Sequence, residues 1–204
     1  TYVFGNSFSI GNRSSAQSSG NLSVGAGSYV AGNTFTGVEN QRHEWGVTIS
    51  ADSHFVGNEI SCGATDNHPC RLLHVGGPNT HVIGNRLRYR LTTVTGLSND
   101  AVSLLQLSGT GEAVVASNVF SYEGLDNALG QMGTNRPIYA TNNGNYQIYN
   151  NVIHVEGNLP EAETPDAAIT LTQPGGNGRV SGNIVVGWAG PVFQSAASLD
   201  TVEF

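Results

Sequence analysis

The chain has 204 residues and a formal net charge of −7, and only 11% of its residues are charged, well below the ~25% of an average domain. Its eight basic residues are all arginine and form no evident basic stripe, which argues against a nucleic-acid-binding protein. No stretch of ~18 consecutive apolar residues is present, so the sequence predicts no membrane-spanning helix.

A short motif recurs from the first residues onward, as in YVFGNSF at Tyr2–Phe8 and YVAGNTF at Tyr29–Phe35. It has an asparagine with one apolar residue three positions before it and another two positions after it. Aligned in this way, the asparagines are Asn6, Asn33, Asn58, Asn85, Asn118, Asn151 and Asn183, separated by 25 to 33 residues. A period in this range, kept over seven repeats, predicts a solenoid.

A second apolar strand precedes most of the motifs. These strands are GVTIS at Gly46–Ser50, LLHVG at Leu72–Gly76, LLQLS at Leu104–Ser108, PIYAT at Pro137–Thr141 and AITLT at Ala168–Thr172. The segments are short, rich in β-forming residues and broken by Gly, Asn and Ser, with almost no 3.6-residue periodicity. Each repeat is therefore predicted to contain, in this order, a strand, a short turn, a second strand, an asparagine bend, a third strand and a long loop.

This pattern resembles the pectate-lyase-like right-handed parallel β-helix superfamily, which includes polysaccharide lyases, polygalacturonase-like hydrolases and phage tailspikes. The resemblance implies an all-β fold and a single domain over residues 1–204: a right-handed parallel β-helix of about seven coils with three strands each. Inward asparagines would stack in a ladder at the bend between the second and third strands, ~4.8 Å apart. Because the register begins and stops within a coil, we expect a slice of a longer solenoid without end caps.

In enzymes of this superfamily, as the resemblance implies, sugar chains cross the sheet of first strands. Here the outward residues of that sheet form a polar row, namely Thr48, His74, Gln106, Tyr139 and Thr170. A second row runs beside it, namely Ser50, Gly76, Ser108, Thr141 and Thr172. We predict that His74, Gln106 and Tyr139 bind substrate, although an ordinary solvated sheet face would have the same composition.

The long loops enter the same sheet, and loops on a rigid scaffold often carry binding residues. For this reason we predict that the substrate is also bound by three residues of these loops, Arg71, Glu44 and Trp45.

Three charged residues precede the first strands of consecutive coils, namely Asp100, Arg136 and Asp166. The two aspartates would lie two coils apart, ~9.6 Å by strand spacing, close to the ~6.5–9.5 Å of an inverting glycosidase pair. We predict them as catalytic residues, with Arg136 holding an acidic sugar between them. An aspartate before a strand is also a common turn residue, so a structural role stays open.

The motifs of the superfamily's enzymes are largely missing. Polygalacturonase-like hydrolases carry Asn-x-Asp, Asp-Asp, Gly-His-Gly and Arg-x-Lys motifs, and only NDAVS at Asn99–Ser103 is faintly similar to the Asp-Asp segment. Many lyases of this fold use Lys or Arg as the base with Ca²⁺ on acidic clusters. This chain has no Lys and no dense acidic cluster, so Arg71 or Arg136 would have to serve. No cofactor or metal site is evident, and Ca²⁺ stays open.

Two cysteines, Cys62 and Cys70, bound the loop CGATDNHPC. We predict a disulfide between them, which would indicate an oxidising compartment. Two free thiols and a metal site are the alternatives, although zinc prefers four ligands at tighter spacing.

Together these features predict an extracellular or cell- or virion-surface protein that binds a polysaccharide and cleaves it, as a hydrolase or a lyase. The alternative is a non-catalytic structural or adhesive solenoid. The resemblance to tailspikes implies a homotrimer, and the uncapped ends imply further β-helix segments as partners.

Overall fold

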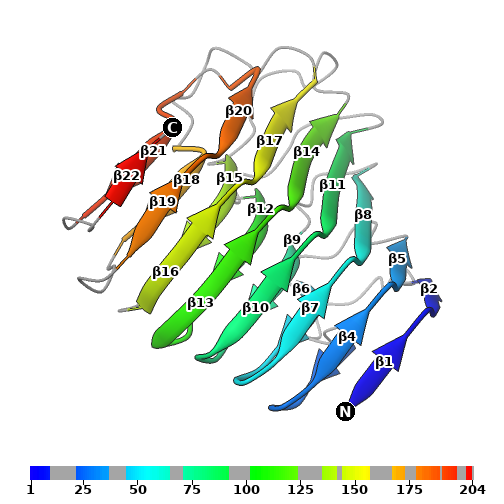
Figure 1. Ribbon diagram of the computed structural model, residues 1–204. Coiled ribbons are helices and arrows are strands. Elements are labelled where there is room, and N and C mark those ends of the chain that lie inside the picture. Colours follow the sequence, from blue (N-terminus) through cyan, green and yellow to red (C-terminus); the bar gives the residue numbers. More distant parts are fainter. Residues whose placement is uncertain are drawn as a thin grey trace, which may run out of the picture.

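The computed structural model describes residues 1–9, 22–36, 45–64, 71–91, 102–123, 135–141, 144–156, 167–172, 178–188, 190–196 and 201–203. These residues form 22 strands in three parallel sheets, and no helix occurs among them. Figure 1 shows the strands as a stack of coils running from one end of the molecule to the other. The prediction of an all-β parallel β-helix with three strands per coil and about seven coils is confirmed.

Each sheet collects one strand from each coil. Sheet A contains β1 (Tyr2–Phe4), β4 (Tyr29–Ala31), β7 (His54–Val56), β10 (Thr80–Ile83), β13 (Gly111–Ala116), β16 (Gly144–Tyr149), β19 (Arg179–Ser181) and β22 (Thr201–Glu203). Sheet B contains β2 (Ser7–Ser9), β5 (Thr34–Thr36), β8 (Glu59–Ala64), β11 (Arg86–Leu91), β14 (Val119–Glu123), β17 (Val152–Val155) and β20 (Ile184–Val186). Sheet C contains β3 (Leu22–Val24), β6 (Trp45–Ile49), β9 (Arg71–Val75), β12 (Val102–Leu107), β15 (Asn135–Ala140), β18 (Ile169–Leu171) and β21 (Phe193–Ser195).

The apolar residues that flank each asparagine form the core. Val30, Phe55 and Val82 are register partners in neighbouring strands of sheet A and are at most 1% exposed. Phe35 and Ile60 are paired and fully buried in the same way in sheet B. Because identical positions of successive coils face inward, the repeat in the sequence becomes continuous apolar columns along the solenoid axis.

The seven asparagines form the predicted ladder between sheets A and B. In each of the first six, the backbone N–H and the side-chain Nδ2 donate to Oδ1 of the asparagine in the next coil, at 2.8–3.1 Å. From Asn33 onward, Nδ2 also donates to a backbone carbonyl of the preceding coil, at 2.8–3.0 Å. Apart from Asn6, these side chains are at most 5% exposed, so their role is structural.

The residue before each ladder asparagine adopts the left-handed backbone that the bend requires. Five of these residues are glycines with φ between +61° and +67°. The other two are Ser117 and Asn150, both with φ +56°. Residues other than glycine and asparagine tolerate the left-handed backbone region poorly. The bend therefore explains why glycine recurs at this position.

Backbone packs directly against backbone at the corner between sheets C and A. A Cβ at Gly77 would lie 2.4 Å from the backbone nitrogen of Ala51, and one at Gly109 would lie 2.5 Å from the carbonyl carbon of Gly77. Residues 51, 77 and 109 therefore form a column in which successive coils touch without space for a side chain on either glycine.

Two tyrosines of sheet B lie inside the coil. Tyr89 and Tyr122 are fully buried and their ring centroids are 6.0 Å apart. Burial raises the pKa of the Tyr89 phenol well above its ordinary value. Burial, together with the neighbouring Tyr89, does the same for the pKa of Tyr122. Both rings therefore serve as neutral core packing.

Candidate functional site

The predicted polar row lies on the outer face of sheet C. The backbone register pairs Thr48 with His74, His74 with Gln106, Gln106 with Tyr139, and Tyr139 with Thr170. The register also adds Ser23 and Gln194 at the two ends of the row, which the sequence analysis missed. Ser23 precedes Asn33 by ten residues, as Thr48 precedes Asn58, so the same counting would have found it.

Arg136 and Tyr139 form the most distinctive pair on this face. The Arg136 guanidinium carbon lies 4.3 Å from the centroid of the Tyr139 ring, well within the ~6 Å range of a cation–π contact. Both side chains are half-buried. The guanidinium therefore covers one face of the ring and leaves only the other face for a ligand. A positive group and an aromatic surface are thus held together next to Gln106.

His74 contacts the second row one coil away. Its Nε2 lies 2.6 Å from Oγ of Ser108, and this hydroxyl also lies 3.3 Å from the carbonyl oxygen of Val75. The carbonyl can only accept. If the Ser108 hydroxyl donates to it, Nε2–H donates to Ser108; in the other tautomer Ser108 donates to the imidazole. Either arrangement fixes the orientation of the ring on the sheet.

Several hydroxyl groups of the two rows bond the protein itself. Thr141 and Thr172 donate to backbone carbonyls of the preceding coil at 3.4 and 3.0 Å, and Oγ of Ser108 lies 3.3 Å from a third such carbonyl. Thr170 is only 7% exposed and donates to the carbonyl of Ala167 at 3.1 Å. These hydroxyl groups are therefore already engaged by the protein, and the row itself presents the half-buried side chains of Thr48, His74, Gln106 and Tyr139.

An apolar column borders the row on one side. Leu72, Leu104, Pro137 and Ala168 each precede a row residue by two positions and so share its face of the sheet by strand alternation, yet all four are buried. The polar row therefore lies beside a covered apolar strip, which accounts for its intermediate exposure.

Most of the predicted catalytic and loop residues fall outside the described part of the chain. This applies to Asp100, Asp166 and Glu44, and to the side chains of Trp45 and Arg71. The backbones of Trp45 and Arg71 are register partners at the starts of β6 and β9. The structure therefore places Arg136, His74, Gln106 and Tyr139 on one face and leaves the aspartate pair a prediction.

Cys62 is buried and is disulfide-bonded. Cys70 lies outside the described residues. The pairing of these two cysteines stays a prediction.

Among the residues that the structure describes, no group of three or more His, Cys, Asp or Glu side chains is arranged to hold a metal ion. No helix in the same ranges is long and apolar enough to cross a bilayer.

Comparison with protein-family models, with curated proteins and with solved structures found no match for this chain.

Proposed function

We propose that this protein is an extracellular, carbohydrate-active β-helix that binds a polysaccharide across the outer face of sheet C. The observation that carries the proposal is the contact between Arg136 and Tyr139, in which the guanidinium carbon lies 4.3 Å from the ring centroid. Tyr139 shares one register row with Gln106 and His74. Sugars are bound in proteins by apolar ring faces combined with a few polar groups, and this face offers both. The guanidinium favours a glycan with carboxylate groups.

The architecture supports the same proposal by resemblance. Three parallel sheets with an asparagine ladder between two of them are similar to the architecture of the pectate-lyase-like superfamily, in which sugar chains cross the sheet that corresponds to sheet C. Fold alone does not determine activity, so this support concerns the location of the ligand more than the reaction.

Cleavage, within this proposal, depends on Asp100 and Asp166. One carboxyl group would protonate the leaving oxygen while the other activates water, as in inverting glycosidases. Replacing either residue in Asp100→Asn or Asp166→Asn should then abolish turnover while glycan binding survives. A reducing-end assay, run with a binding assay on the same glycan, measures both effects. Full cleavage by both variants would locate the chemistry elsewhere, first at Glu44 and His43.

The glycan itself can be identified with an array of neutral and acidic polysaccharides, probed with the parent protein. The proposal expects at least one hit, with carboxylated glycans preferred over neutral ones of the same linkage. Absence of any hit across such an array would remove the support for a carbohydrate ligand.

A structural or adhesive solenoid is the second candidate, and the outer face of sheet A favours it. From β1 to β10 its outward residues are Tyr2, Phe4, Tyr29, Ala31, His54, Val56, His81 and Ile83, none of which is Asp, Glu, Lys or Arg. Tyr2 and Phe4 are 79% and 54% exposed. Such a face suits packing between copies, as in a trimer of β-helices. Sedimentation of a stable trimer, with no array hit, would favour this reading.

A further inference from the structure

Strand β11 carries a row of three arginines on the outer face of sheet B. Arg86, Arg88 and Arg90 alternate with Leu87 and Tyr89, which point inward and are fully buried. Alternate residues of a strand lie on one face, about 6.6–6.8 Å apart. Three of the chain's eight basic residues are therefore aligned on one strand. We refer to Arg86, Arg88 and Arg90 as the arginine row.

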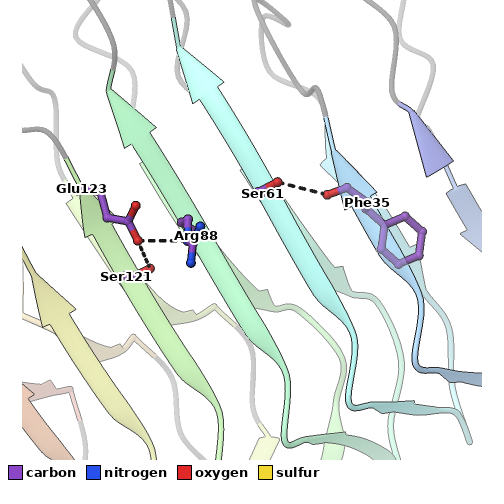
Figure 2. A network of polar contacts seen from close by, with 5 residues as sticks. All are labelled: Phe35, Ser61, Arg88, Ser121 and Glu123. Atoms are coloured by element: carbon purple, nitrogen blue, oxygen red, sulfur yellow. Dashed lines mark hydrogen bonds and ion pairs between the residues drawn. The ribbon is translucent and has the colours of Figure 1, made fainter. Parts of the chain in front are cut away.

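The central arginine is already held in place. Nε of Arg88 lies 2.9 Å from Oε1 of Glu123 on β14, and the side chains are 28% and 20% exposed. The N–H of Arg88 is not aimed at that oxygen, so the contact is an ion pair without a hydrogen bond. Figure 2 shows Arg88 between Ser61 on one neighbouring strand and Ser121 and Glu123 on the other. Ser121 donates to the same oxygen of Glu123 at 3.3 Å.

The two outer arginines are open to an external ligand. Arg86 and Arg90 are exposed, and neither forms an ion pair with another residue in the described part of the chain. Glu59 is the register partner of Arg86, and Glu123 that of Arg90. Neither of these cross-strand pairs forms an ion pair. Glu123 contacts Arg88 instead of Arg90.

Charge on this part of sheet B is opposite in sign to that of the whole chain. Three guanidinium groups on β11 face two carboxylates on the adjacent strands, Glu59 and Glu123, which gives a local balance of 3 − 2 = +1. The chain as a whole carries −7. A cationic strip on an acidic protein attracts anionic groups locally, while the net charge repels polymers with dense negative charge.

We propose that the arginine row is a binding site for an acidic polysaccharide, whose carboxylate or sulfate groups contact Arg86 and Arg90 with Arg88 between them. A guanidinium group can form two parallel hydrogen bonds to a carboxylate or to a sulfate. A row of three cations fits a polymer with repeated charges better than a single small anion. Nucleic acid is less suitable, because duplex DNA places one charge in every ~1.7 Å and is repelled more strongly by the acidic chain. This site lies on sheet B and does not depend on the ligand face of sheet C.

The experiment measures binding of polygalacturonate, dextran sulfate and neutral dextran to the full chain by isothermal titration at low salt. The first two probes separate carboxylate from sulfate recognition. Arg86→Gln and Arg90→Gln should each weaken binding of the preferred anionic polymer about tenfold, because each removes a charge-assisted contact. Neutral dextran should not bind through this row.

Two further variants distinguish the row from general electrostatics. Arg179→Gln removes the same charge from an exposed arginine on sheet A and should change affinity less than twofold. Glu123→Gln should instead strengthen binding severalfold, because it releases Arg88 from its ion pair. Circular dichroism on each variant verifies that the fold is retained.

Equal weakening by Arg179→Gln and Arg90→Gln would show a nonspecific charge effect and overturn the inference. Oligo-dT, titrated under the same conditions, serves as the nucleic-acid probe. If it binds through the same arginines more tightly than either anionic polysaccharide, the inference is also overturned. If Tyr139→Ala abolishes binding of the anionic polymer and the arginine variants do not, the polymer binds on sheet C. That outcome rejects the arginine row and leaves the proposed function standing.

Discussion

Replacing Asn118 with valine should lower the free energy of unfolding by at least about 3 kcal/mol, because it leaves several buried polar groups unpaired at ~1–3 kcal/mol each. The Asn118 side chain is 0% exposed. Its Nδ2 donates to the carbonyl of Val82 and to Oδ1 of Asn151, and its Oδ1 accepts the backbone N–H and Nδ2 of Asn85, all at 2.9 Å. Valine can replace none of these bonds. Urea unfolding followed by circular dichroism measures the loss.

Asn6→Val is the matched control, since Asn6 is an exposed member of the same ladder. Its side chain donates to the carbonyl of Phe4 and to Oδ1 of Asn33, where water can replace it. A loss below about 1 kcal/mol is expected there. Equal losses in the two variants would mean that burial of the ladder amides is not what stabilises the coils.

Gly109→Ala should destabilise the protein by about 3 kcal/mol, the upper end of the usual range for inserting a group into packed structure. Its Cβ would lie 2.5 Å from both the carbonyl carbon and the oxygen of Gly77. The obstructing atoms belong to the backbone of the preceding coil, so relief requires the two coils to separate. Thermal unfolding monitored by circular dichroism gives the change in stability.

Gly25→Ala tests whether the loss at Gly109 comes from this close contact. A Cβ at Gly25 would meet no atom within 4 Å, and Gly25 does not have a positive φ. This substitution should be neutral or stabilise the fold by up to about 1 kcal/mol, because it reduces the freedom of the unfolded chain. If Gly109→Ala proves equally harmless, the coils are packed less tightly at this corner than described.

The sequence was sufficient to predict the ladder and the columns beside it. Counting from one asparagine to the next identifies Val30, Phe35 and their equivalents as inward residues, because the bend fixes the register on both sides of it. The glycine before five of the seven asparagines is typical of a left-handed backbone. Ser117 and Asn150 take the same conformation, so position in the repeat was a better guide than residue type.

The far side of each coil was harder to predict. Spacings between asparagines range from 25 to 33 residues, so the register drifts with distance from the ladder. The close approach of Gly77 and Gly109, and the use of the Thr170 hydroxyl within its own coil, depend on local turns that counting does not define. These features appear only in three dimensions.

The arginine row shows a signal that was present and overlooked. The segment RLRYRL places arginines on alternate positions around Leu87, and Leu87 occupies the apolar position of the repeat two residues after Asn85. Alternation therefore predicts that all three arginines face outward. The statement that the chain lacks a basic stripe is wrong at this strand. The ion pair between Arg88 and Glu123 on the next coil could not be predicted from the sequence.

The claim that sheet C is the ligand face is tested most directly with two tyrosines. Tyr139 on sheet C and Tyr149 on sheet A are both half-buried, so each can be replaced by alanine and titrated with the glycan found on the array. Tyr139→Ala should weaken binding about tenfold, through loss of an aromatic face and of the cation–π partner of Arg136, while Tyr149→Ala should change affinity less than twofold. Unchanged binding in Tyr139→Ala, or a larger loss in Tyr149→Ala, would contradict a ligand face on sheet C.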